Sequence, residues 1–430
     1  MNGSGVERGI RVCLANDSFP PLIDGVANTV VNYAAVIEKQ FGSAIVATPG
    51  YPGVTDDYPF PVVRYRSLNT TRLLGYRSGD PFDPDTFSKI SSFSPDVIHS
   101  HCPLASSFLC RGLREETGAP LVFTYHTKFD IDFERALKLG FLKEAAVRVM
   151  IENISASDEV WAVNRGAADN LRSLGYGGEI RIMPNGVDFP EGRLSGEDTA
   201  ALRAELGLSR DVPVFLFVGR MMWYKGQRII LEGLRRLVSS GRDFRMLFVG
   251  DGDDLAEIKK AAEDCGVGDR CRFTGAVRDR GKLRELYSIS DLFILPSVFD
   301  NNPIVVKEAA ACAVASVLIR GSSSAEGATD GVDSLLIGED GEELAAVLER
   351  SVYENDLTRR LGEAALRDLY VSWDDMIASA VSRYREIIAA HRSGELPERK
   401  RRLSDIAIET LADISSAVGQ MRDSLPQWIR

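Results

Sequence analysis

The chain has 430 residues, too many for one ordinary hydrophobic core and about enough for two α/β domains with an extension. Its 62 acidic residues outnumber its 51 basic residues, and the resulting net charge of -11 argues against general nucleic-acid binding, which needs a basic surface. The composition, 44% hydrophobic and 26% charged, is that of a soluble globular protein.

Short apolar runs alternate with helical segments through the first half of the chain. The run at 10–15 predicts a strand, and after a loop with two prolines a helix is expected at 26–39. Further apolar runs predict strands at 44–48, 96–101, 121–126, 159–163 and 180–183. Nearly continuous apolar strands separated by helices indicate a parallel sheet that is covered on both faces.

The same pattern restarts after a polar stretch at 191–198. Apolar runs separated by helices predict strands at 214–218, 245–249, 272–274, 292–295 and 316–319. The sequence therefore predicts an α/β protein with two doubly wound domains, residues 1–190 and 191–373, and a ligand between them at the carboxyl ends of both sheets. Residues 374–430 are expected to be helical, with the first helix crossing back to the N-terminal domain.

Two cations stand at a strand-to-helix junction in the second half. Gly219 and Arg220 follow directly on the strand at 214–218, and Lys225 precedes the next helix. Arginine supplies a planar fork, lysine a point charge and the helix N-terminus a dipole, so together they can hold a diphosphate. A solvated basic loop is the alternative interpretation.

Two carboxylates bracket another junction of this kind. Asp300 lies in the loop after the strand at 292–295, and Glu308 lies in the first turns of the following helix. In open α/β folds this edge of the sheet is where ligands bind, and carboxylates there can accept hydrogen bonds from sugar or ribose hydroxyls. The pair predicts a sugar-nucleotide site.

Other candidate site residues carry weaker signals. Gly25 opens the first helix and would let a phosphate approach the backbone, although a plain turn is nearly as consistent. His126 ends a strand and is a candidate for substrate contact, as is His101, whereas a lone histidine is usually structural. The acidic segment 250–254 could bind metal or cap a helix, and capping is favoured. Small residues at 322–327 could form an anion nest or a simple turn.

The segment 134–151 mixes lysine and arginine with apolar residues. Such a segment can lie on an anionic membrane, although an ordinary amphipathic helix packed on the sheet is the alternative. No apolar run approaches the ~20 residues that span a bilayer, and six scattered cysteines indicate reduced thiols. We expect a cytoplasmic protein that contacts the inner face of the membrane peripherally if this segment binds lipid.

Taken together, these motifs resemble those of the retaining glycosyltransferases of family GT4, which have the GT-B fold. The resemblance runs from about residue 10 to about residue 390 and is strongest between 214 and 336. Its markers are the segments 185–188, 219–226, 250–252, 296–297, 300–309 and 330–332.

The resemblance implies two Rossmann-like domains facing across a cleft, with a C-terminal helical extension. It also implies a metal-independent hexosyltransferase that retains the anomeric configuration of its donor. The donor would be a nucleotide-diphosphate sugar, with a UDP-sugar favoured, and no separate cofactor is expected. The acceptor would be a hydroxyl of a lipid of the diacylglycerol type, a glycan precursor or a small metabolite.

Site residues are carried over by the same resemblance. Arg220 and Lys225 would hold the leaving diphosphate, and Asp300 and His126 would face the donor sugar. Glu308 would bind the ribose hydroxyls. The remaining residues of the nucleotide site would be Gly25, Gly219, Gly252 and Glu326.

The turn after Asp300 departs from the family pattern. Asn301-Asn302-Pro303 replaces a typical Gly-aromatic-Gly turn, and Pro303 has no N–H group to donate to a sugar. The departure bears on which sugar is used more than on the reaction class. A nucleotide-sugar epimerase or a phosphorylase of the same fold, and a non-catalytic sugar-nucleotide-binding subunit, stay open as alternatives.

Overall fold

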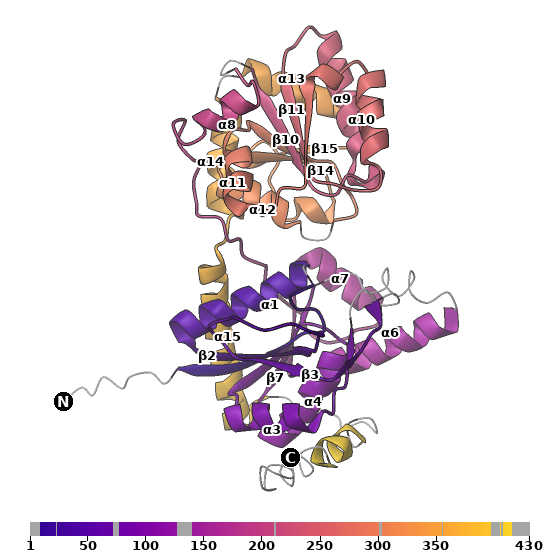
Figure 1. Cartoon of the computed structure of the whole chain (residues 1–430), viewed down its shortest axis with the longest axis vertical. Helices are drawn as coiled ribbons and strands as arrows, with labels where there is room; N and C mark the ends of the chain where they lie inside the picture. Colours follow the sequence, from indigo (N-terminus) through magenta and orange to yellow (C-terminus); the bar gives the residue numbers. More distant parts are fainter. Residues whose placement is uncertain are drawn as a thin grey trace, which may run out of the picture. The chain divides into compact units, whose positions relative to one another are not determined.

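The computed structural model describes residues 9–22, 24–71, 77–126, 140–209, 212–300, 303–354, 356–396, 405 and 407–414, with the backbone alone at 141 and 142. Contacts divide the chain into two compact units (Figure 1). Unit 1 comprises Met1–Pro184 and Trp373–Arg430, and unit 2 comprises Asn185–Ser372. The domain limits predicted at 190 and 373 lie next to these divisions.

Unit 1 contains a seven-stranded parallel sheet in the order β3-β2-β1-β6-β7-β8-β9. The central strands β6 and β7 are buried along their whole length, as their apolar sequences predict. A separate antiparallel pair is formed by β4 (Ser67–Leu68) and β5 (Ser78–Gly79). The strands of the sheet are β1 (Ile10–Ala15), β2 (Gly42–Pro49), β3 (Val62–Tyr65), β6 (Val97–Ser100), β7 (Leu121–Tyr125), β8 (Glu159–Ala162) and β9 (Arg181–Ile182).

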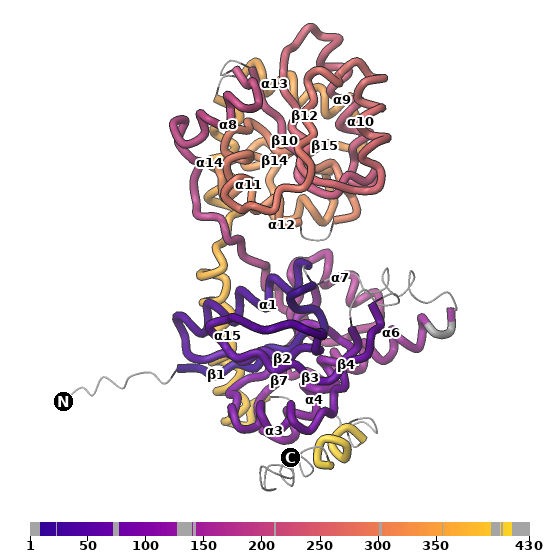
Figure 2. Tube along the Cα trace, viewed as in Figure 1, coloured from indigo at the N-terminus to yellow at the C-terminus, as the bar shows by residue number. Residues whose placement is uncertain are grey.

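Helices cover both faces of this sheet (Figure 1). One face is covered by α1 (Gly25–Val36) and α15 (Trp373–Ser393), which lie side by side in Figure 2. The helix expected at 26–39 ends its α-helical part at Val36 and continues as the π-helical turn η1 (Ile37–Phe41). The other face is covered by α3 (Pro84–Phe93), α4 (Ala105–Thr117), α6 (Gly140–Ile154) and α7 (Arg165–Ser173).

The helix α15 is an integral part of unit 1 although it comes last in the chain. Tyr384 stacks on Trp161 of β8 with ring centroids 5.3 Å apart, and its hydroxyl contacts His99 at the end of β6. Nearby, Arg383 forms an ion pair with Glu159. These contacts bury one face of the sheet under a helix that is more than 200 residues away in sequence.

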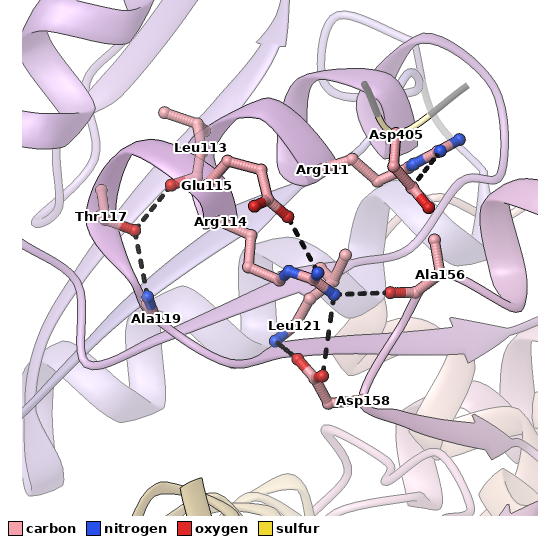
Figure 3. Close-up of polar contacts among 10 residues, drawn as sticks. All are labelled: Arg111, Leu113, Arg114, Glu115, Thr117, Ala119, Leu121, Ala156, Asp158 and Asp405. Carbon is pink, nitrogen blue, oxygen red and sulfur yellow. Dashed lines mark hydrogen bonds and ion pairs between the residues drawn. The ribbon is translucent and has the colours of Figure 1, made fainter. Parts of the chain in front are cut away.

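The last described segment, 405 and 407–414, is helical and contacts α4 through Ala412 and through Asp405, which Figure 3 shows beside Arg111. Ala412 lies in the core formed by α3, α4 and the sheet. The approach is close because Gly112 has no side chain: a Cβ atom there would lie 2.8 Å from Phe87 and 3.2 Å from Ala412. Arg111 and Asp405 form an ion pair at 2.6 Å with side chains only 3% and 5% exposed.

Unit 2 contains a six-stranded parallel sheet in the order β12-β11-β10-β13-β14-β15. Its β10, β13 and β14 strands are fully buried. The strands are β10 (Val214–Val218), β11 (Arg245–Val249), β12 (Cys271–Gly275), β13 (Leu292–Leu295), β14 (Ala315–Ile319) and β15 (Ser334–Ile337).

The helices of unit 2 again form two layers around the sheet (Figure 1). One layer consists of α9 (Gln227–Ser239), α10 (Leu255–Asp264) and α13 (Gly341–Tyr353). The other consists of α11 (Arg280–Ser288), α12 (Ile304–Ala311) and α14 (Leu357–Leu369). The short elements are α8 (Ala200–Glu205), η2 (Trp223–Lys225), η3 (Gly268–Arg270) and η4 (Ser323–Ala325).

Candidate functional site

The strand order of unit 2 reverses between β10 and β13. After β10 the chain moves to β11 on one side, and after β13 it moves to β14 on the other. Ligands of open α/β sheets bind at such a switch point, at the carboxyl ends of the two strands. Arg220 and Lys225 follow β10, and Asp300 follows β13, so three of the predicted site residues come from this point.

The loop after β10 is held in place by tight backbone contacts. The N–H groups of Gly219 and Met221 donate to carbonyls of the β11 loop at 2.9 and 3.0 Å. Gly226 has φ +88°, and a Cβ atom there would lie 2.1 Å from the carbonyl oxygen of Pro296. A Cβ atom at Gly252 would lie 2.5 Å from the carbonyl oxygen of Met221. These contacts fix the backbone on which Arg220 is carried.

The two cations of this loop stand in different electrostatic surroundings. Lys225 forms an ion pair with Asp300, and both side chains are largely buried, at 14% and 16% exposed. The other oxygen of Asp300 is buried and has no partner among the described residues. Arg220 is exposed, and its side chain makes no hydrogen bond or ion pair with any residue that the structure describes. Its charge is therefore available to an anionic ligand.

Two helix N-termini beside these residues lack a side-chain cap. The N-cap of α9 is Gly226 and that of α12 is Pro303, and neither makes a capping hydrogen bond through its side chain. The first N–H groups of a helix have no partner within the helix and carry the positive end of its dipole. An anion at either N-terminus would be stabilised by these N–H groups and by the helix dipole.

Glu308 is buried on α12, with 2% of its surface exposed. Its Oε1 lies 2.8 Å from a guanidinium nitrogen of Arg280, and its Oε2 accepts a hydrogen bond from Tyr287 at 3.0 Å. Burial raises the pKa of Glu308, and Arg280 and Tyr287 oppose this rise. Neither Arg280 nor Tyr287 was among the predicted site residues, because both lie on α11, away from any recognisable motif.

Lys307 lies next to Glu308 and ties α12 to the start of unit 2. Its Nζ donates to the carbonyl oxygen of Asn185 at 2.7 Å. Burial lowers the pKa of Lys307 to about 8, and the charge of Glu326 opposes this shift. Glu326 is itself exposed and follows η4, where Ser324 donates to the carbonyl oxygen of Asp300 at 3.3 Å.

The acidic segment 250–254 holds neighbouring loops together. Asp254 accepts a hydrogen bond from the backbone N–H of Trp223 at 2.8 Å, and Asp251 accepts one from Gly252 at the same distance. Asp254 is the N-cap of α10 but makes no side-chain capping bond to that helix. In the described ranges no three His, Cys, Asp or Glu side chains are placed to hold a metal ion together.

The sheet of unit 1 has its own switch point, between β1 and β6. Gly25 begins α1 after β1, and a Cβ atom at Gly25 would meet nothing within 4 Å. The preceding Asp24 already accepts hydrogen bonds from the N–H groups of Val26 and Ala27. A phosphate at this helix N-terminus would compete with that cap, and its contact with Gly25 stays a prediction.

Three histidines of unit 1 point to the sheet face that α1 and α15 cover. Successive residues of a strand alternate between faces, which places His99 and His101 together. The Nδ1 of His101 lies 2.9 Å from the Nε2 of His126, and His99 contacts Tyr384 and, at 2.7 Å, Thr124. The second ring nitrogens of His101 and His126 are buried without a partner among the described residues.

His126→Gln should alter the pH dependence of stability. Burial lowers the pKa of His126 to about 3, below its value near 6.5 in an unfolded chain. Between these values the unfolded state binds more protons, so the histidine's contribution to stability is present above pH 6.5 and is lost as the pH falls toward 3. Urea titrations at pH 7, 5.5 and 4 should show the stability gap between wild type and variant changing by on the order of 3 kcal/mol.

A constant gap across these pH values would show that His126 is protonated equally in both states. The variant must give the same circular dichroism as the wild type at pH 7 for this comparison to hold.

The predicted membrane segment 134–151 is described only from residue 140 onward, as α6. Lys143, Val147 and Arg148 of this helix line an open hollow together with Leu174. No helix in the described ranges is long and apolar enough to cross a membrane. Contact with a membrane surface stays a prediction.

Two family descriptions match this chain, one for each half. The family described as glycosyl transferases group 1 matches residues 198–368, and glycosyltransferase family 4 matches residues 23–189. The chain belongs to the GT4-type glycosyltransferases. In this GT4-type glycosyltransferase the first match spans β10 to β15, which carry the switch point with Arg220, Lys225 and Asp300.

Curated relatives of this glycosyltransferase are similar over about two thirds of its length. The D-inositol 3-phosphate glycosyltransferase of Xylanimonas cellulosilytica is 29% identical over 306 residues, 67% of this chain and 71% of the relative. The GDP-mannose-dependent alpha-mannosyltransferase of Corynebacterium glutamicum is 26% identical, with 77% of each chain covered. The alpha-monoglucosyldiacylglycerol synthase of Streptococcus pneumoniae is 22% identical, with 70% of this chain and 69% of the relative covered.

Solved glycosyltransferases share the fold. A glycosyltransferase from Rickettsia africae superposes with a TM-score of 0.67 at 19% identity, covering 89% of this chain and 99% of that one. Anabaena HepE, in complex with UDP and glucose, gives 0.63 at 18% identity, covering 87% and 99%. The predicted fold class, a GT-B glycosyltransferase with two doubly wound Rossmann-like domains and a helical C-terminal part, is confirmed.

Proposed function

We propose that this glycosyltransferase transfers a hexosyl group from a nucleotide-diphosphate sugar to a hydroxyl acceptor with retention of anomeric configuration. The observation that carries this proposal is the charge arrangement at the switch point of unit 2. An exposed guanidinium, Arg220, stands with Lys225 and two helix N-termini that lack side-chain caps. Such a set suits a diphosphate and would stabilise the charge that develops on it as the sugar leaves.

In the proposed reaction the bond between the anomeric carbon and the diphosphate oxygen breaks, and a bond to the acceptor oxygen forms on the same face. The electron pair leaves with the diphosphate, where Arg220 and Lys225 hold it. The acceptor's proton passes to a phosphate oxygen of the leaving group. Two cations and the helix ends would neutralise the diphosphate, so the proposed transfer needs no metal ion.

The ion pair between Lys225 and Asp300 must rearrange when a donor binds. In the present structure the ammonium is balanced by the Asp300 carboxylate. We propose that the diphosphate takes over part of this interaction, and that Asp300 turns its second oxygen, which has no partner among the described residues, to a hydroxyl of the sugar. The proposed roles of His126, Gly25 and Glu326 are contacts with the sugar, the phosphates and the nucleotide.

The relatives act on different acceptors, and so the acceptor is assigned here only as a hydroxyl compound. The name of one relative includes inositol 3-phosphate, and the name of another includes monoglucosyldiacylglycerol as its product. The name of a third includes GDP-mannose, on which that enzyme depends. The HepE complex was solved with UDP and glucose. For this chain we favour a UDP-sugar as donor and a lipid, a glycan precursor or a small metabolite as acceptor.

A thermal-shift screen with UDP-, GDP- and ADP-sugars tests the donor. A ligand that binds only the folded protein at 100 times its Kd adds about 2.7 kcal/mol of stability, so the true donor class should raise Tm distinctly. Incubation of that donor with hydroxyl acceptors, with and without EDTA, and NMR of the product anomer then test transfer, retention and metal independence. If the donor is epimerised in the absence of an acceptor, the protein is an epimerase. If it binds the donor without turning it over, it is a non-catalytic subunit.

A further inference from the structure

Arg280 has no part in the proposed transfer, yet it contacts the carboxylate that the proposal places on the ribose. It is the first residue of α11, and its guanidinium lies 2.8 Å from Oε1 of Glu308. The same guanidinium also pairs with both oxygens of Asp188, through Nε at 3.1 Å and through Nη2, the nitrogen that contacts Glu308. It also lies over the ring of Phe189, 4.2 Å from the centroid. Three neighbours therefore fix this side chain against Glu308.

Tyr287 holds the second oxygen of Glu308. Its ring is fully buried, and its hydroxyl lies 3.0 Å from Oε2 of Glu308 and 3.2 Å from the carbonyl oxygen of Val305. Each carboxylate oxygen thus has one protein partner. An ionised carboxylate offers about four acceptor positions, so one on each oxygen is left over. Two acceptor positions on one carboxylate are what the two hydroxyls of a vicinal diol require.

We propose that Arg280 is a positioning residue for nucleotide binding, which keeps Glu308 ionised and oriented to accept hydrogen bonds from a ribose diol. This inference rests on the proposed function. The pair differs from an ordinary surface ion pair because Glu308 is 3% exposed in its side chain, whereas Arg280 is 44% exposed. A buried carboxylate without a counter-charge takes up a proton, and a protonated acid loses an acceptor position and gains a donor.

The charges that face Glu308 fix the sign of the effect. Burial raises its pKa and so does Asp188, whereas Arg280 and Tyr287, both on α11, lower it. Above its pKa the carboxylate offers all of its acceptor positions, and below its pKa one of them is lost to the proton. Without Arg280 that pKa rises, so nucleotide affinity should fall at low pH and recover at high pH. Each unit by which the pKa exceeds the working pH lowers the ionised fraction about tenfold.

Calorimetric Kd values for UDP, GDP and ADP, and for their 2′,3′-dideoxy counterparts, test this from pH 6 to pH 9. For the diphosphate that the wild type prefers, Arg280→Gln should bind on the order of tenfold more weakly at pH 6 and approach wild type at pH 9. Arg280→Lys, which keeps the charge, should recover most of the loss. Arg278→Gln removes an exposed arginine two residues before Arg280 that makes no hydrogen bond or ion pair with the described residues, and it should bind like wild type. The dideoxy compounds should be nearly insensitive to Arg280→Gln.

Three results would overturn the inference. An equal loss for ribo and dideoxy compounds would mean that Arg280 acts on the fold, and a loss that does not change with pH would mean that Glu308 stays ionised without it. Tighter binding by Arg280→Gln would mean that Arg280 competes with the ribose. If Arg280→Gln does not fold, two other measurements test the inference. Equal affinity of the wild type for ribo and dideoxy compounds decides against the inference, and so does a loss of nucleotide affinity by Arg280→Lys at every pH. A wild type that binds no nucleoside diphosphate would instead refute the proposed function itself.

Discussion

Arg220→Ala should lower the rate of sugar transfer by a factor on the order of 10²–10³, because it removes one preorganised partner of the charge that develops on the leaving diphosphate. The loss should appear in kcat as well as in kcat/KM, since the charge is larger in the transition state than in the bound donor. Arg220→Lys should recover part of the rate, because it keeps the charge but not the planar fork. Steady-state kinetics with the donor found by the thermal-shift screen measure these values.

The fold should tolerate Arg220→Ala. Arg220 is exposed, and no described residue pairs with its side chain, so the free energy of unfolding should change by no more than about 0.5 kcal/mol. Arg235→Ala is a matched control, because Arg235 is an exposed arginine further along α9. Near-normal turnover by Arg220→Ala would remove the central argument for the function, and an equal loss in Arg235→Ala would attribute the effect to net charge.

Asp405→Asn should destabilise unit 1 by about 3–5 kcal/mol, because it removes the carboxylate charge that pairs with the buried Arg111. Arg111 Nη2 lies 2.6 Å from the Asp405 carboxylate (Figure 3). Arg111 also donates to the side-chain oxygen of Asn153 at 2.7 Å. Differential scanning calorimetry measures the shift as a lower Tm for the transition of unit 1. Asp413→Asn is the control, because Asp413 lies on the same segment and is exposed.

The double variant Arg111→Met with Asp405→Leu separates charge from packing. Replacing both members of a buried ion pair by apolar residues of similar volume is often neutral or stabilising, so this variant should recover most of the lost stability. If Asp405→Asn melts within about 1 °C of the wild type, the segment 405–414 does not contribute to unit 1 in solution.

Five of the six strands of unit 2, β10 to β14, could be predicted from the sequence because their signals are local, whereas β15 was not predicted. The apolar run before Gly219 predicted β10, and the run before Pro296 predicted β13. Burial of both faces of a parallel sheet makes such runs continuous. The four-residue strand β3 was missed, because its sequence VVRY includes an arginine and lies on the sheet edge.

The partners of Glu308 and Arg111 could not be predicted in this way. Arg280 lies 28 residues before Glu308, on the surface of another helix, and Asp405 lies 294 residues after Arg111. Nothing in the local sequence distinguishes these charges from solvated ones. The proximity of His101 and His126 was easier to predict, because the alternation of side chains along neighbouring strands places both on one face of the sheet. The turn at 301–302 and the segments 127–139 and 415–430 lie outside the described residues.

The crossing of α15 into unit 1 has a consequence for how the protein is made. Unit 2 is a continuous stretch that is complete once Ser372 has left the ribosome, whereas the sheet of unit 1 lacks α15, one of the two helices that cover one of its faces, until residues 373–393 follow. Domains generally fold as units during synthesis. The part that begins first therefore finishes last, and throughout the translation of unit 2 the ring of Trp161 lacks the Tyr384 side chain that stacks on it.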